Sequence, residues 1–264
     1  MSAQAAGRAV AERDCHTGRM VGQSALTPPV GRHPGLNAAL HPDRPWIRLA
    51  RFVVGVLVLA ALVRKTADAT LPGNDVDVPQ LFSEFTVQSN LALAVVLLAS
   101  AAVPRDTLPQ WWDRLAGALA LYLVMTGVIY VVLVSPPGEP WWSLDLYWPQ
   151  LIHHRIAPMF AALDWLLVTR TGRGRWWRPL AWLGYPAAFL IFSWVRGALD
   201  GWYVYDFLDP TLEGGWAAAL TTTAEVLAAF LVAAVLLHVA GNARAGLTTE
   251  PGRAPRSGGP AARA

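Results

Sequence analysis

Long apolar stretches, separated by short polar segments, are the dominant pattern along this chain. A membrane-spanning helix needs about 20 predominantly apolar residues. The pattern predicts helices over 46–67, 79–103, 112–135, 148–169, 178–201 and 216–240. The predicted fold class is therefore all-α: a polytopic membrane protein built as a bundle of six transmembrane helices.

Composition supports this assignment. Hydrophobic residues make up 54% of the 264 residues and charged residues only 15%, and the mean hydropathy is +0.35, whereas soluble domains carry about 25% charged residues. The flanking segments 1–45 and 241–264 are rich in Ala, Gly, Pro and Arg. We expect a disordered leader, a transmembrane domain over 46–240 and a disordered tail. Cys15 is the only cysteine, so no intrachain disulfide can form.

The second and fourth predicted helices carry polar residues within their length. The fully apolar part of the second, 91–103, is too short to span a bilayer. It spans only if the polar segment before it lies inside the bundle. The helix over 148–169 must likewise include a polar segment.

The distribution of basic residues predicts orientation. Arginines concentrate in the leader, in the loops after the second and fourth helices and in the tail, while the alternate loops are acidic or neutral. Arg64 and Lys65, at the end of the first helix, are the exception. The positive-inside rule then places the protein in the cell membrane with both termini in the cytoplasm.

Polar side chains gather near the predicted outer ends of four helices. They are Glu84, Thr86, Gln88, Ser89 and Asn90; Gln150, His153, His154 and Arg155; Arg196 and Asp200; and Thr221, Thr222, Thr223 and Glu225. At 1.5 Å per residue, Thr86, His154 and Arg196 all lie roughly 10 Å deep, with Glu225 slightly deeper. Ionisable residues inside a bilayer are costly, so this layer predicts a functional chamber that opens to the outer side.

The residue types indicate the chemistry that such a chamber could perform. Thr86 is the candidate nucleophile, and a threonine hydroxyl needs a base within hydrogen-bond reach. His154 or His153 could supply it, because imidazole titrates near neutrality. Asn90, one turn below Thr86, could donate to an oxyanion, as could backbone N–H groups.

Two charged residues complete the candidate site. Arg196 could hold a carboxylate or phosphate group of a substrate. Glu225 or Glu84 could orient the histidine, because Asp164 lies three helical turns from His153, too far for direct contact.

Plainer interpretations stand beside these. A threonine in a membrane helix often donates to the carbonyl of residue i−4. Asn90, with its polar neighbours, could join helices by hydrogen bonds, and Arg196 could pair with Asp200. Adjacent histidines point about 100° apart on a helix, which is poor for chelation. With no metal, phosphate-loop, dinucleotide or nucleic-acid motif, we expect no metal, no cofactor and no nucleic-acid partner.

Three segments carry a family resemblance. They are FTVQSNLALAVVLL, LIHHRIAPMFAALDWLL and YPAAFLIFSWVRGALDGWYVYDFLDP. Together they resemble the bacterial Pr-six-Pr family of six-helix membrane proteins, which is remotely similar to the eukaryotic androgen-induced and androgen-dependent membrane threonine hydrolases of fatty-acid esters. The resemblance covers roughly 45–240. It implies hydrolysis of lipid esters, with the family threonine at Thr86 and the family histidine at His154, or at His153 if the frame is one residue longer.

The sequence leaves a second function open. The same chamber could serve a non-enzymatic protein that binds or transports a lipid or small molecule. Under either hypothesis the expected partners are membrane lipids, with a lipid ester as the substrate of the enzyme.

Overall fold

The computed structural model describes residues 39–73, 77–169 and 174–248, with side chains to 245. The described residues belong to one compact unit, whose fold is given below. All regular structure there is helical. The predicted leader lies almost wholly outside the described residues, as does the tail beyond 248.

Five helices in the described ranges are long and apolar enough to cross a membrane. They are α2 (Pro45–Ala69), α4 (Phe85–Ala102), α5 with η2 (Trp111–Val134), α6 to η4 (Trp148–Thr169) and the apolar part of α10 (Gly215–Thr248). They correspond to five of the predicted helices. The prediction of an all-α polytopic membrane protein is confirmed.

The fifth predicted helix, over 178–201, is divided in two. It forms α8 (Arg178–Trp182) and α9 (Gly184–Asp200), with Leu183 between them. Pro186 has no N–H to donate to the carbonyl of Trp182, four residues earlier. The Tyr122 hydroxyl donates to that carbonyl instead, at 2.8 Å.

The second predicted helix is also interrupted. A capping box between Asp77 and Gln80 starts the short α3 (Val78–Leu81), and Ser83 donates back to the Pro79 carbonyl at 2.7 Å. Glu84 is extended (φ −69°, ψ 135°) and acts as N-cap of α4. Thr86 therefore lies in the first turn of a new helix, and not seven residues into a continuous one.

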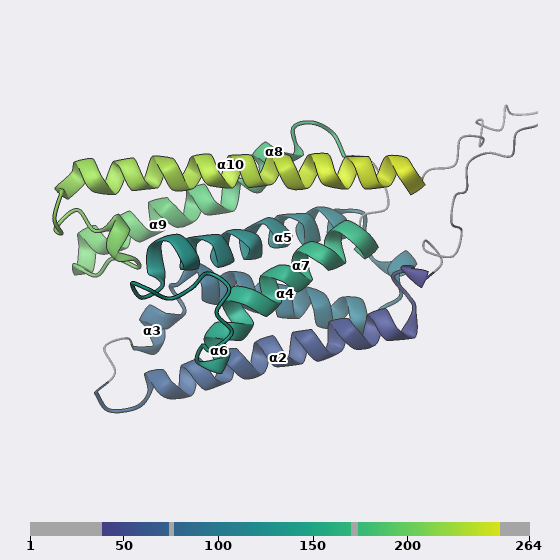
Figure 1. Cartoon of the computed structure of the whole chain (residues 1–264), viewed down its shortest axis with the longest axis horizontal. Helices are drawn as coiled ribbons and strands as arrows, with labels where there is room; N and C mark the ends of the chain where they lie inside the picture. Colours follow the sequence, from purple (N-terminus) through teal and green to yellow (C-terminus); the bar gives the residue numbers. More distant parts are fainter. Residues whose placement is uncertain (1–38, 74–76, 170–173, 249–264) are drawn as a thin grey trace, which may run out of the picture. The chain divides into compact units, whose positions relative to one another are not determined.

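Helix α4 packs against α2 and α5, α7 (Ala157–Leu163) packs against α5, and α10 packs against α5 and α8 (Figure 1). Arg48, near the start of α2, donates to the carbonyls of Ala101 and Ala102 at 2.7 and 2.8 Å. These carbonyls are unsatisfied at the C-terminus of α4. The contact ties the beginning of α2 to the end of α4, so the two helices run antiparallel.

Helix α10 continues past its predicted end at 240. Asn242 accepts a hydrogen bond from the Gly174 N–H at 2.7 Å, and Arg244 donates to the Leu167 carbonyl at 2.9 Å. These contacts to the preceding chain favour helix over 241–248, where composition alone indicated a disordered tail.

Candidate functional site

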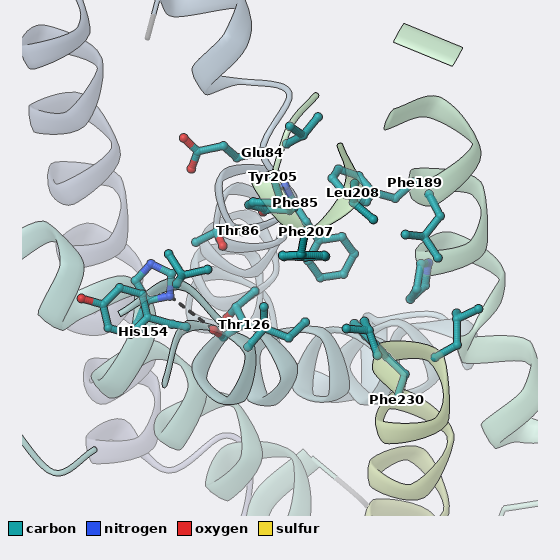
Figure 2. Close-up of a pocket in the computed structure, with 18 of the residues that line it drawn as sticks. Glu84, Phe85, Thr86, Thr126, His154, Phe189, Tyr205, Phe207, Leu208 and Phe230 are labelled. Atoms are coloured by element: carbon teal, nitrogen blue, oxygen red, sulfur yellow. Dashed lines mark hydrogen bonds between the residues drawn. The ribbon is translucent and has the colours of Figure 1, made fainter. Parts of the chain in front are cut away.

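One cavity of about 240 Å³ lies among the N-terminus of α4, α5, η3 (Ile152–Ile156), α9, α10 and the loop around η5 (Asp206–Leu208). Its polar lining comprises Lys65, Glu84, Thr86, Thr126, Gln150 and His154. Its remaining lining is aliphatic and aromatic. Figure 2 shows Glu84, Thr86 and His154 on one side of the cavity and Phe189 and Phe230 on the other. The cavity is therefore amphipathic.

Thr86 lines this cavity with a side chain only 7% exposed. Its hydroxyl makes no hydrogen bond to its own helix within the described part of the chain. Thr126 and Thr223 do, donating to the carbonyls of Leu123 and Ala219 at 2.7 Å. Thr126 and Thr223 therefore make the usual hydrogen bond of a helical threonine to its own helix, whereas Thr86 does not.

Tyr205 is the neighbour that the sequence analysis missed. Its hydroxyl accepts the Phe85 N–H at 3.1 Å and lies within hydrogen-bonding reach of the Thr86 hydroxyl and N–H. Burial, and secondarily the Glu84 carboxylate, raise the pKa of Tyr205, so the phenol stays protonated. The only signal was its position in the loop YVYDF, inside the segment with the family resemblance.

His154 lies in η3, where the helix widens to i→i+5 hydrogen bonds; the Ala157 N–H donates to the Ile152 carbonyl. Pro158 explains the distortion, because it has no N–H to give to the His154 carbonyl. The ring nitrogen Nδ1 of His154 lies 3.4 Å from the Thr126 carbonyl oxygen, as the dashed line in Figure 2 marks. A carbonyl accepts only, so Nδ1 carries the proton and Nε2 is left as the acceptor.

His153 has a different environment. The residue is 0% exposed and faces the backbone of Val58, and neither ring nitrogen makes a well-formed hydrogen bond to another described residue. It does not line the cavity. Of the two adjacent histidines, only His154 therefore shares a cavity with Thr86.

No hydrogen bond joins Thr86 and His154 in the described ranges. They reach the cavity from different helices, and Figure 2 shows them at separate points of its polar side. A ligand or a water molecule can lie between them.

Asn90, Arg196 and Glu225 are not among the lining residues. Asn90 is 0% exposed and donates to the Thr86 carbonyl at 2.9 Å. Arg196 donates to Ser83 Oγ and to Asp200 at 3.2 Å, and its guanidinium covers the Trp202 ring at 4.5 Å. Glu225 is on an exposed face of α10, whereas Val226 faces the cavity. The predicted layer thus divides, and four of its members, Glu84, Thr86, Gln150 and His154, line the cavity.

Lys65 and Glu84 form an ion pair at the polar side, with Lys65 Nζ 3.1 Å from Glu84 Oε2. Arg64, beside Lys65, pairs with Asp68 at 2.9 Å and donates to Tyr147 at 2.8 Å. These pairings explain why Arg64 and Lys65 occur at the predicted outer end of α2, although the neighbouring outer loops are otherwise acidic or neutral.

Among the described residues, no three His, Cys, Asp or Glu side chains gather closely enough to hold a metal ion. Comparison with protein-family models, with curated proteins and with solved structures finds no match to this chain.

Proposed function

We propose that this membrane protein hydrolyses lipid esters, with Thr86 as nucleophile and His154 as general base. The observation that carries the proposal is that both side chains line one amphipathic cavity, the threonine hydroxyl making no bond to its own helix and the imidazole Nε2 left as acceptor. The family resemblance of the three sequence segments supports the same pair.

The reaction proceeds in two halves. Thr86 Oγ attacks the ester carbonyl carbon while its proton passes to His154 Nε2, directly once the substrate closes the gap or through one water. The tetrahedral intermediate collapses, the C–O bond to the alcohol breaks, and His154 returns the proton to the leaving alkoxide. Water then attacks the acyl-threonine ester and gives a proton to His154. The bond between the acyl carbon and Thr86 Oγ breaks, His154 returns the proton to Oγ, and the fatty acid leaves.

The developing oxyanion needs donors near Thr86 Oγ. The first N–H groups of α4 have no partner within their helix, but those of Phe85 and Thr86 are directed to the Tyr205 oxygen. The partial positive charge of the helix N-terminus still favours an anion there. The neutral Tyr205 hydroxyl adds a donor at the same place. These groups replace Asn90, whose amide N–H is engaged by the Thr86 carbonyl.

Covalent labelling in mild detergent tests the mechanism. A fluorophosphonate should form an adduct on Thr86 that mass spectrometry locates, and Thr86→Ala and His154→Ala should each abolish both labelling and ester turnover. Thr223→Ala is the matched control, because Thr223 is an equally buried threonine that donates to its own helix away from the cavity. Full turnover by a folded Thr86→Ala variant would exclude this mechanism. Labelling of Thr223 or of no residue would leave a binding role for the cavity.

The proposed setting is the cell membrane, with both termini in the cytoplasm and the cavity in the outer half. The support is the distribution of arginines along the chain.

A further inference from the structure

We propose that the ligand of this cavity is an uncharged, single-chain lipid ester with a free hydroxyl, of the monoacylglycerol class. The ester part of this inference rests on the proposed function, while the recognition of an uncharged head and one chain rests on the cavity itself.

The two sides of the cavity match the two parts of an amphiphile. Phe85, Phe189 and Phe230 pack edge to face, with ring centroids 5.1 and 5.8 Å from Phe85, and Leu190 and Leu208 lie in the same lining. An acyl chain buries its methylene groups favourably there. Glu84, Thr86 and His154 lie together on the other side, and Lys65 pairs with Glu84 there (Figure 2). This arrangement orients the ester toward the nucleophile.

The charge balance of the polar side favours a neutral head group. Lys65 and Glu84 are the charged residues of the lining, and they neutralise one another at 3.1 Å. Their side chains are only 15% and 21% exposed, so the pair is partly desolvated. A lipid carboxylate or phosphate would bring an uncompensated charge into this site or would have to displace Glu84. An uncharged head group meets neither cost.

Gln150 supplies a specific need for a hydroxyl. Its amide oxygen is buried, lines the cavity region and has no hydrogen-bond partner in the described part of the chain. A buried acceptor without a donor is costly. This oxygen has almost no accessible surface, so the Gln150 amide must rotate slightly to present it to the cavity. A ligand hydroxyl would then satisfy it and place the glycerol-like part of the molecule beside Lys65 and Glu84.

The size of the cavity limits the ligand to one chain. Pockets for small molecules usually have volumes of roughly 300–1,000 Å³, and this one measures about 240 Å³. A second acyl chain would have to remain outside in the bilayer.

Binding to non-hydrolysable ligands tests the inference without catalysis. The probes are a 1-O-alkylglycerol, the fatty acid of equal chain length and a 1-O-alkylglycerol 3-phosphate, titrated against the full-length protein in detergent with calorimetric detection. We expect the alkylglycerol to bind at least about tenfold more tightly than either anion. Gln150→Leu should weaken alkylglycerol binding about 2- to 10-fold, the value of one hydrogen bond. It should leave unchanged the binding of the matching 1-O-alkyl-2,3-di-O-methylglycerol, which has no free hydroxyl.

The double variant Lys65→Gln with Glu84→Gln distinguishes the head-group classes. It removes both charges and keeps polar side chains. Alkylglycerol affinity should stay within about threefold. Tighter binding of an anion than of the alkylglycerol in the wild type, lost in the double variant, would overturn the inference, and so would absence of alkylglycerol binding.

Turnover separates this inference from the proposed function. Suppose that the alkylglycerol binds, but the matching monoacylglycerol is not cleaved and Thr86 does not react with the fluorophosphonate. The proposed ligand class is then supported and the proposed hydrolase activity is excluded. If only esters with a charged head group are cleaved, through Thr86, the hydrolase stands and the neutral ligand class is excluded.

Discussion

The imidazole of His154 lies against the ring of Tyr130, with ring centroids 4.2 Å apart and an interplanar angle of 24°. The guanidinium of Arg155 also covers this ring, at 5.1 Å, and reaches Glu139 at 3.4 Å. The Tyr130 hydroxyl donates to the same carboxylate at 3.3 Å. The loop that carries Glu139 is thus connected to the orientation of the proposed base.

Stacking on Tyr130 should therefore support turnover. Tyr130→Leu removes the aromatic surface under His154, and aromatic pairs contribute about 0.5–1.5 kcal/mol. We expect kcat for ester cleavage to fall about 2- to 12-fold, with a smaller change in KM. Tyr130→Phe keeps the ring and loses only the long bond to Glu139, so its kcat should stay within about twofold. Equal losses in the two variants would show that the hydroxyl, and not stacking, is what matters.

The close approach of α5 to η3 depends on Gly127. A Cβ there would lie 3.1 Å from the His154 carbonyl oxygen and 3.5 Å from Pro158. Gly127→Ala should therefore push the widened turn away from α5 and lower both activity and thermal stability, the latter by about 1–3 kcal/mol.

Gly55→Ala is the control for that variant. Its Cβ would meet the flexible side chain of Leu98 at 2.9 Å, away from the cavity. Its thermal stability should change less, because the gain in helix propensity of about 1 kcal/mol partly offsets the contact. Its specific activity should equal that of the wild type. Full activity in Gly127→Ala would contradict the proposed importance of the position of η3.

The ion pair of Arg51 and Asp164 should stabilise the fold and not the reaction. Arg51 Nε lies 2.8 Å from Asp164 Oδ1, and both residues also bond to Thr169. Arg51→Met or Asp164→Leu alone leaves a buried charge without its partner and should lower the free energy of unfolding by about 3–5 kcal/mol.

The double variant should lose less stability than the sum of the single variants, because no charge is left uncompensated. Thermal unfolding in detergent measures all three. Activity per folded molecule should be unchanged, since neither side chain lines the cavity. Single variants within 1 kcal/mol of the wild type would show that the pair contributes little.

Tyr205 should make the folded protein sensitive to alkaline pH. An ordinary tyrosine titrates near pH 10 in the unfolded chain, whereas burial raises the pKa of Tyr205 in the fold. Its neutral form is therefore favoured by folding, and the resulting stability is present below about pH 10 and lost as the pH rises further. Between pH 9 and 11, the unfolding temperature of Tyr205→Phe should fall less than that of the wild type. Parallel curves would contradict a raised pKa.

Cys15 offers a direct test of the proposed orientation. As the only cysteine, it should react with a membrane-impermeant maleimide only after cells are permeabilised. Leu144 is 71% exposed in the loop that follows α5. Cysteine placed there by Leu144→Cys in a Cys15→Ser background should react in intact cells. The reverse labelling pattern would invert the topology.

The positions of the membrane helices could be derived from the sequence. Apolar segments such as 46–67 and 112–135 are unfavourable in water and long enough to span a bilayer, and changes in composition mark their ends. The breaks inside the predicted second and fifth helices could not be located in the same way. They depend on partners distant in the sequence, such as the Tyr122 hydroxyl that satisfies the Trp182 carbonyl.

The candidate site was predictable only in part. Thr86 and His154 were identifiable because a hydroxyl and an imidazole at membrane depth are costly. Equal depth, however, does not fix the direction in which a side chain points. Glu225 was expected at the same chamber, yet the rotation of α10 puts Val226 toward the cavity and Glu225 on an exposed face.

That this chain is an all-α membrane protein with polar groups concentrated near one end of its helices follows from local sequence, because bilayer thickness and the cost of burying charge act on each segment separately. Which of those groups meet depends on how the helices pack. Helix rotation and the packing of Pro158 against Gly127 bring His154, and not His153, to the cavity of Thr86. A loop more than 100 residues away brings Tyr205 to the same place. Such contacts follow from the packing of whole helices, which no single segment encodes.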